Sequence, residues 1–255
     1  MKDSNSIQPQ VKYKILLVGD IGEDIYTYGD VNRISPEAPV PVFESKYIVT
    51  KAGMAGNVAK NLEALGCHVN FLHGETSVKN RLIDIRSKQQ LIRLDKDIIS
   101  EPIKFETAIP PVYDAVVISD YNKGTVTYEL IEELVKEVNV PIFVDTKKTD
   151  LARLSGCYIK INALEKSRAT SLPDSEHLIV THGGDGAYWN GRVYAAEIVG
   201  DVIDVCGAGD TFLAALVYEF LKTGHMPDAV KFANKASAVT VQHIGVYAPS
   251  LEEIK

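Results

Sequence analysis

One segment of the chain places small residues and a carboxylate directly before an apolar helical pattern. It reads Asp204-Val205-Cys206-Gly207-Ala208-Gly209-Asp210. Gly207, Ala208 and Gly209 would let backbone N–H groups approach a ligand, and the start of the following helix favours negative charge. Asp210 beside such an anion site could accept a proton from an attacking hydroxyl during phosphoryl transfer. The segment therefore predicts a phosphoryl-transfer centre; the alternative is a glycine-containing turn with Asp210 as an acidic residue of the first helical turn.

A second glycine-containing segment, Thr181-His182-Gly183-Gly184-Asp185-Gly186, follows the apolar run 178–180. Its T-x-G-x-x-G spacing would expose a hydroxyl and backbone amides at the carboxyl edge of a sheet, where α/β folds bind ligands. We expect Thr181, Gly183 and Gly186 to bind nucleotide phosphates. The alternative is a turn before a hairpin over 187–195. The segment is neither a Rossmann fingerprint nor a Walker A loop, because it opens no helix after the first strand and the chain has no Gly-Lys pair.

Polar residues near the N-terminus are candidates for binding a sugar. Asp20 and Asp24 follow the first apolar run, where carboxylates can accept hydrogen bonds from hydroxyl groups, and Asp24 is the first choice. The alternative for each is a solvated acidic turn or a helix N-cap. The segment 52–59 contains Gly53 and Asn57 among small residues that let a helix begin close to the sheet. Asn57 can donate and accept hydrogen bonds with a hydroxyl, although a capping Asn is the alternative.

Asn162 and Glu165 lie three residues apart where a strand passes into a helix. This spacing puts both side chains on one face of the first helical turn, where they could orient waters around Mg²⁺. The same pattern is also that of a capping box. After another apolar run, Lys147 or Lys148 could meet phosphate, although a solvated charge pair is the commoner explanation.

The composition limits the class of protein. The chain has 255 residues, 45% of them hydrophobic, and a net charge of −7, which suits one large α/β domain over 11–255 after a flexible tail, 1–10. Without a basic stripe, general nucleic-acid binding is not expected. Three separated cysteines and six histidines without metal spacing indicate reduced thiols and no zinc site. No apolar run is long enough for a membrane span and the N-terminus has no apolar leader, so we expect a cytoplasmic protein without membrane contact.

Short apolar runs alternate with helical patterns, which is typical of a mostly parallel sheet covered by helices on both faces. The expected buried strands are 15–18, 69–72, 115–119, 141–145, 158–161 and 177–181. The expected helices are 54–65, 129–138, 211–222 and 227–241. The stretch 26–50, rich in proline and alternating apolar residues, predicts a small β lid with 88–96 pairing to it. The alternative is a long connecting loop, which is uncommon in compact domains.

Taken together, these segments resemble the ribokinase-like (PfkB-type) family of carbohydrate kinases. The family's C-terminal signature is met by 204–211, its N-terminal glycine signature by 52–59, its N-x-x-E element by Asn162 and Glu165, and its nucleotide turn by 181–186. The resemblance implies a doubly wound three-layer α/β/α fold with a lid. It also implies phosphoryl transfer from ATP with Mg²⁺, Asp210 as the catalytic base, and water-mediated metal contacts of Asn162 and Glu165. It adds Asp204 and Asn234 to the expected nucleotide site.

Within the family, the likeness is greatest to members that phosphorylate the C1 hydroxyl of D-glycero-β-D-manno-heptose 7-phosphate. The segments that carry it are 18–26, Arg33-Ile34-Ser35-Pro36-Glu37-Ala38-Pro39-Val40-Pro41-Val42, 89–95 and 119–124. It implies a 1,7-bisphosphate product on the way to nucleotide-activated heptose, sugar contacts from Arg93 and Asp120, and a homodimer through the lid.

The chain also departs from these relatives. Cys206 replaces a usual Thr, Ala52 replaces a glycine, and the stretches 74–86 and 165–178 are shorter. The rival interpretations are therefore a kinase for a different sugar or sugar phosphate, and a nucleotide-binding protein without turnover.

Overall fold

The computed structural model describes residues 13–105, 109–110, 112–197 and 200–254; the expected tail, 1–10, lies outside them. An eight-stranded sheet forms the body, in the order β12-β11-β10-β9-β8-β7-β1-β4. Its strands are β1 (Lys14–Gly19), β4 (His68–His73), β7 (Ala115–Asp120), β8 (Ile142–Thr146), β9 (Tyr158–Asn162), β10 (Leu178–Thr181), β11 (Ala187–Trp189) and β12 (Arg192–Tyr194). From β4 to β10 neighbouring strands are parallel, and β11 and β12 add an antiparallel hairpin at one edge.

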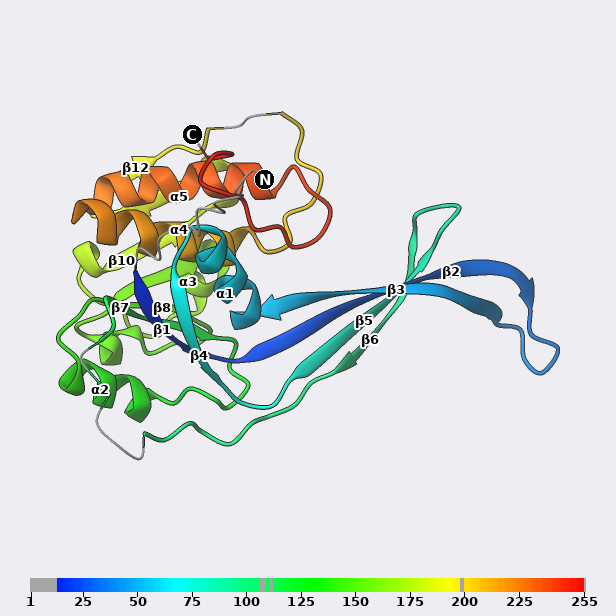
Figure 1. Ribbon diagram of the computed structural model, residues 1–255, viewed down its shortest axis with the longest axis horizontal. Helices are drawn as coiled ribbons and strands as arrows, with labels where there is room; N and C mark the ends of the chain where they lie inside the picture. The colour runs from blue at the N-terminus through cyan, green and yellow to red at the C-terminus, as the bar shows by residue number, and fades with distance from the viewer. Residues whose placement is uncertain (1–12, 106–108, 111, 198–199, 255) are drawn as a thin grey trace, which may run out of the picture.

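Helices cover both faces of this sheet because its strands are apolar on both sides. In β1, Ile15 and Leu17 join one core cluster, and Leu16 and Val18 join the other. The first cluster is completed by α1 (Ala55–Ala64), α4 (Ala208–Thr223) and α5 (Met226–Thr240), and the second by α2 (Tyr128–Glu137). Figure 1 shows α4 and α5 on one side of the sheet and α2 on the other. A short helix, α3 (Ala163–Arg168), follows β9. The expected α/β/α layers are confirmed.

The order of strands brings the chemistry-bearing segments to one edge. β1 lies between β4 and β7, and the chain then adds β8, β9 and β10 outward on the β7 side. Parallel strands end at the same edge, so the segments that follow β1, β7, β8, β9 and β10 meet there. These are the segments that begin near Asp20, Tyr121, Thr146, Asn162 and Thr181.

A second sheet of four strands, in the order β3-β2-β5-β6, extends away from the body (Figure 1). It consists of β2 (Ile21–Ile34), β3 (Pro41–Met54), β5 (Ser77–Asp84) and β6 (Gln90–Lys96), and we call these four strands the lid. The lid is larger than expected, because β2 and β3 extend past the predicted range and β5 was not predicted. Lys79 and Arg81 alternate through β5, so that strand has no apolar run.

No helix among the described residues is both long enough and apolar enough to cross a membrane.

Candidate active site

Two cavities lie on either side of the first turn of α4. One has a volume of about 380 Å³ and is lined by Ala208 and Gly209, together with residues of β9, β10 and α5. The other, of about 170 Å³, is lined by Gly207 and Asp210 together with residues of the lid. We call them the nucleotide-side cavity and the acceptor-side cavity, after the ligands that the sequence predicts for their linings. The segment 207–210 therefore contributes to both.

Most of the residues expected at the nucleotide line the larger cavity. Its lining includes Asn162, Thr181, Gly183, Gly186 and Asn234. Asn234 also donates its side-chain amide to the carbonyl of Tyr194 at 2.8 Å, which ties α5 to the edge hairpin. Asp204 is among the lining residues of neither cavity; its carboxylate accepts the N–H groups of Cys206 at 3.0 Å and Gly245 at 2.8 Å.

Two glycines in these turns have no room for a side chain. Gly207, the N-cap of α4, has φ +78°, and a Cβ there would lie 2.7 Å from Nδ2 of Asn57. Gly186 has φ +94°, and a Cβ would collide with the backbone carbonyl of Tyr194. Both positions combine a left-handed backbone with a close neighbour, so both require glycine.

The acceptor-side cavity is closed by lid residues of opposite charge. Asp24 from β2 accepts a hydrogen bond from the Arg81 guanidinium at 2.5 Å, and both side chains are largely buried. Lys79, two residues before Arg81 on β5, lines the same cavity, as does Gly53. A Cβ at Gly53 would lie 2.7 Å from Oδ2 of Asp24, so this glycine leaves space for that carboxylate. The cavity thus offers both hydrogen-bond acceptors and cationic donors.

Asp210 is held by two donors from elements distant in the sequence. Nδ2 of Asn57, from α1, donates to Oδ2 at 2.8 Å, and the Tyr121 hydroxyl donates to Oδ1 at 2.8 Å. Burial raises the pKa of Asp210 to about 6, even though both hydrogen bonds lower it. The carboxylate is therefore ionised at neutral pH and able to accept a proton, as a general base requires. Asn57 was expected at the sugar; in the structure it contacts this carboxylate and is not among the lining residues of the acceptor-side cavity.

Two of the predicted sugar-binding carboxylates instead hold a loop in place. Asp20 is 1% exposed and accepts the N–H groups of Tyr121, Lys123 and Thr125. Asp120, also 1% exposed, accepts the N–H of Asn122. Its other oxygen accepts the Thr146 hydroxyl and pairs with Lys148. Neither carboxylate is among the residues that line the acceptor-side cavity, which corrects their expected position.

Arg93 lies one strand further from the acceptor-side cavity than expected. It is on β6 opposite Arg81, pairs with Asp95 at 2.8 Å and is not among the lining residues.

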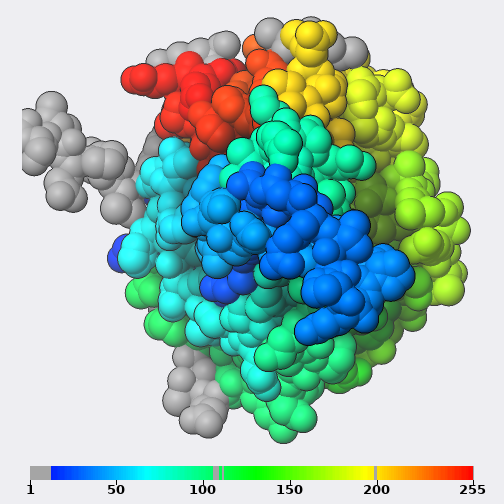
Figure 2. All heavy atoms as spheres, turned by 90° about the vertical axis from the view of Figure 1, so that its right-hand side faces the viewer, coloured from blue at the N-terminus to red at the C-terminus, as the bar shows by residue number. Residues whose placement is uncertain are grey.

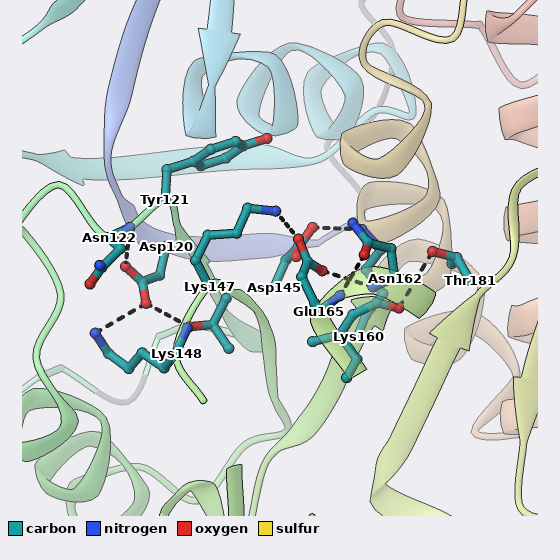
Figure 3. Close-up of polar contacts among 12 residues, drawn as sticks. Asp120, Tyr121, Asn122, Asp145, Lys147, Lys148, Lys160, Asn162, Glu165 and Thr181 are labelled. Atoms are coloured by element: carbon teal, nitrogen blue, oxygen red, sulfur yellow. Dashed lines mark hydrogen bonds and ion pairs between the residues drawn. The ribbon is translucent and has the colours of Figure 1, made fainter. Parts of the chain in front are cut away.

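Asn162 and Glu165 form the capping box that was the alternative for them. The Asn162 side chain accepts the Glu165 N–H at 2.9 Å, and Glu165 accepts the Asn162 N–H at 2.8 Å. The second oxygen of Glu165 accepts a hydrogen bond from Lys147 (Figure 3). Among the described residues, no three or more His, Cys, Asp or Glu side chains gather to hold a metal ion directly.

A buried ion pair lies beside this box. Nζ of Lys160 on β9 donates to Oδ2 of Asp145 on β8 at 2.6 Å, and both residues are largely buried (Figure 3). Although burial lowers the pKa of Lys160, the ion pair raises it overall, so the ammonium stays charged. Lys160 lines the nucleotide-side cavity, and its Nζ lies 3.0 Å from where a Cβ of Gly209 would be. A permanent cation therefore lies beside the predicted anion site.

Sequence reasoning did not select Tyr121, Lys160, Lys79 or Arg81 for the site. One usable signal is Lys160, a charged residue inside the otherwise apolar strand Tyr158-Ile159-Lys160-Ile161. Tyr121 lies next to Asp120 in a segment that carried the family likeness, but a carboxylate was taken to be the ligand there.

Comparison with known proteins finds a family match in the C-terminal part of the chain. Residues 148–254 match the pfkB family carbohydrate kinase. The chain is 32% identical to the bifunctional protein HldE of a Nitratiruptor species, over an alignment of 303 residues that covers 96% of this chain and 65% of that protein. The bifunctional protein HldE of Helicobacter pylori (strain G27) is 33% identical, with 94% and 65% covered. The chain thus spans about 65% of the length of these relatives.

Solved structures share the fold over 95% of the chain. The ribokinase of Thermotoga maritima superposes with a TM-score of 0.67 at 16% identity, covering 95% of this chain and 98% of that one. The Arabidopsis thaliana ribokinase complexed with ribose and ATP gives a TM-score of 0.66 at 16% identity, covering 95% and 97%. The expected ribokinase-like fold is confirmed, and residues 148–254 carry the match to the pfkB family carbohydrate kinase.

Proposed function

We propose that this chain transfers the γ-phosphoryl group of ATP to the C1 hydroxyl of D-glycero-β-D-manno-heptose 7-phosphate. The observation that carries the proposal is the position of Asp210. Its buried carboxylate lines the acceptor-side cavity, while the neighbouring Ala208 and Gly209 line the nucleotide-side cavity. A base on one side of the segment and backbone amides on the other is the arrangement that in-line phosphoryl transfer needs.

In this reaction Asp210 orients the acceptor hydroxyl and removes its proton as the oxygen attacks phosphorus. The N–H groups at the start of α4 and the Lys160 ammonium stabilise the charge that develops on the transferred group. ADP leaves with the electron pair of the broken bond. The hydrogen bond from Asn57 restrains the orientation of Asp210 before the acceptor arrives.

The lid supports a phosphorylated acceptor. Lys79 and Arg81 bring two cations to the acceptor-side cavity, which Glu23 and Asp24 of the lid also line, and such cations are suited to binding a phosphate. Asp24 is oriented by Arg81 and accepts hydrogen bonds from hydroxyl groups. The choice of a heptose rests on the sequence likeness in 33–42 and 89–95.

The residues present fit Mg²⁺ bound through water. Mg²⁺ is usually held by one or two carboxylates, several waters and the substrate phosphates. Oδ1 of Asp145 is buried and has no hydrogen-bond partner among the described residues, and Glu165 lies in the first turn of α3, directly after the neighbouring strand β9. These two carboxylates and Asn162 would hold the hydrated ion, which would help to neutralise the charge of the phosphates.

We further propose that the chain forms a homodimer through its lid. Strand alternation puts Asp24, Lys79 and Arg81 on one face of the lid and Ile48, Ile92 and Leu94 on the other. The latter three side chains are 61%, 49% and 52% exposed, which is typical of a surface that a partner covers.

A panel of acceptors tests the proposed reaction. We expect ADP release with ATP, Mg²⁺ and heptose 7-phosphate, and little with ribose, fructose 6-phosphate or no acceptor. Asp210→Asn should lose about 100-fold or more in kcat and still bind ATP, because it removes the base and keeps the shape. If only a different sugar were turned over, the proposed acceptor would be wrong. If the protein bound ATP but turned over no acceptor, the proposed enzymatic activity would be rejected.

A further inference from the structure

Tyr121 lines the acceptor-side cavity, and the proposed reaction assigns it no role. Its hydroxyl lines that cavity and donates to Oδ1 of Asp210 at 2.8 Å. Burial and the adjacent Asp210 carboxylate raise the pKa of Tyr121 well above its ordinary value. The hydroxyl therefore keeps its proton at neutral pH, and it acts as a donor to Asp210.

The loop that carries Tyr121 is fixed at both ends. The Tyr121 N–H donates to Oδ2 of Asp20 at 2.7 Å, and Lys123 and Thr125 donate to the same carboxylate. On the other side, Asp120 accepts the N–H of Asn122, whose φ is +59°. Two buried carboxylates and a left-handed residue are more than a surface turn requires. They hold the Tyr121 ring in one place relative to α4.

The ring is also covered from the nucleotide side. The Lys147 ammonium lies 5.2 Å from the centre of the Tyr121 ring and also pairs with Glu165. Figure 3 shows Lys147 between Tyr121 and the capping box. The ring thus has a protein cation against it, and its hydroxyl donates to a carboxylate that is only 6% exposed, where hydrogen bonds are stronger than in water.

We propose that Tyr121 is a positioning residue, whose hydroxyl aims the Asp210 carboxylate at the acceptor hydroxyl and keeps it ionised. The proposal rests on the role of Asp210 as the base. Other charged groups act on the same carboxylate: Asp145 disfavours its charge, Lys160 favours it, and Cys206 lies close enough to interact with it. Asn57 supplies the second hydrogen bond. Tyr121 differs from all of these, because it alone among them both donates a hydrogen bond to Asp210 and lines the acceptor-side cavity.

The test is Tyr121→Phe, which keeps the ring and deletes the donor. Two quantities are measured against pH: kcat/KM with ATP and the best acceptor, and the ¹³C chemical shift of the Asp210 carboxyl in the ligand-free protein, assigned with Asp210→Asn. A protonated base cannot accept the substrate proton, so activity of the natural chain should fall as pH drops through about 6. Without the donor, both midpoints should rise by about one pH unit. Activity near pH 6 should then fall about fivefold more than activity near pH 8.

A matched control separates this effect from lost stability. The Tyr128 hydroxyl accepts the Asp150 N–H at 3.0 Å and lines neither of the two cavities, so Tyr128→Phe also deletes one hydrogen bond. It should leave both midpoints unchanged. If Tyr121→Phe does not fold, 3-fluorotyrosine at position 121 serves instead; its more acidic hydroxyl donates more strongly, so both midpoints should fall.

The proposal is overturned if the Asp210 carboxyl titrates at the same pH with and without the Tyr121 hydroxyl in a folded protein. The carboxyl titration needs no substrate. If no acceptor were turned over, the proposed function would fail while the titration would still decide the role of Tyr121.

Discussion

Two buried lysines at the same edge of the main sheet have similar ion pairs but different surroundings. Lys160 pairs with Asp145 at 2.6 Å, and Lys148 pairs with Asp120 at 3.1 Å. Both have side chains that are less than 10% exposed. Lys160 faces the nucleotide-side cavity beside Gly209, whereas Lys148 lines neither cavity and donates to the carbonyl of Val126. We therefore assign Lys148 to stability and expect Lys160 to act on phosphate as well.

Replacing each lysine with Met distinguishes these roles. Both variants leave a buried carboxylate without its cation, so both should lose about 3–5 kcal/mol of unfolding free energy. Lys160→Met should also lower kcat by roughly 100-fold, because a cation beside the transferred phosphoryl group is removed. Lys148→Met should retain kcat at a temperature where it is folded. Chemical denaturation and steady-state kinetics measure the two effects; equal kcat values in the two variants would contradict the role of Lys160.

The sequence shows where the carboxylates are, but it does not show what surrounds each of them in the folded protein. Asp20, Asp24 and Asp120 all follow or end apolar strands, and all three were expected at the sugar. Only Asp24 lines the acceptor-side cavity, while Asp20 and Asp120 accept loop N–H groups. Asp20 accepts N–H groups from a loop about 100 residues away in the sequence. Whether a carboxylate lines the cavity or holds such a loop therefore depends on the tertiary fold, which no local sequence pattern encodes.

At the scale of elements, the start of α4 has the most demanding backbone. Gly207 is in the left-handed region, and Asn57 and Val246 lie against it. The same helix ends at Gly224, whose φ is +66° but around which a Cβ would meet nothing within 4 Å. Both ends of α4 thus have a glycine with a left-handed backbone, but only Gly207 has neighbouring atoms that would collide with a side chain.

This difference predicts unequal effects of the same substitution. Gly224→Ala should cost about 1 kcal/mol of stability from backbone strain alone and leave activity intact. Gly207→Ala should cost more, and it should also displace Asn57 from Asp210 and lower kcat/KM by at least about tenfold. Thermal unfolding and kinetics on both variants check this. Full activity in Gly207→Ala would show that the segment tolerates a side chain.

Elements were predictable where packing alone decides them. The strands β1, β7 and β8 are buried apolar runs, and each was expected within a residue or so of its bounds. The hydrophobic pattern was less helpful in the lid, since β5 reads Ser-Val-Lys-Asn-Arg-Leu-Ile-Asp. Lys79 and Arg81 line the acceptor-side cavity, so the requirements of that cavity replace the apolar pattern by which a strand is recognised.

At the scale of the whole molecule, the acceptor-side cavity exists only where the lid meets the body. Asp24, Lys79 and Arg81 come from the lid, and Asp210 and Tyr121 come from the body. Lys51 on β3 joins the two, because its ammonium donates to the carbonyls of Ile244 at 3.0 Å and Val246 at 3.2 Å. Anything that steadies the lid therefore also steadies the acceptor-side cavity.

A second copy of the chain could supply that support. The lid projects from the body towards the viewer in Figure 2, so both of its faces extend beyond the main sheet. One face carries the residues of the acceptor-side cavity, and the other exposes Ile48, Ile92 and Leu94. Burying such side chains in a symmetric contact stabilises a dimer in proportion to the apolar area removed from water.

Light scattering after gel filtration tests the proposed dimer. The chain has a mass of 28.0 kDa, so the molar mass measured for the natural protein should be about twice that value. Ile92→Lys introduces a charge into the apolar lid face and should shift the protein towards the monomer, since an unpaired charge is costly to bury. Leu172→Lys, at a 47% exposed leucine of the body, is the matched control and should remain dimeric. A natural protein that elutes as a monomer at micromolar concentration would mean that the lid closes its cavity without a partner.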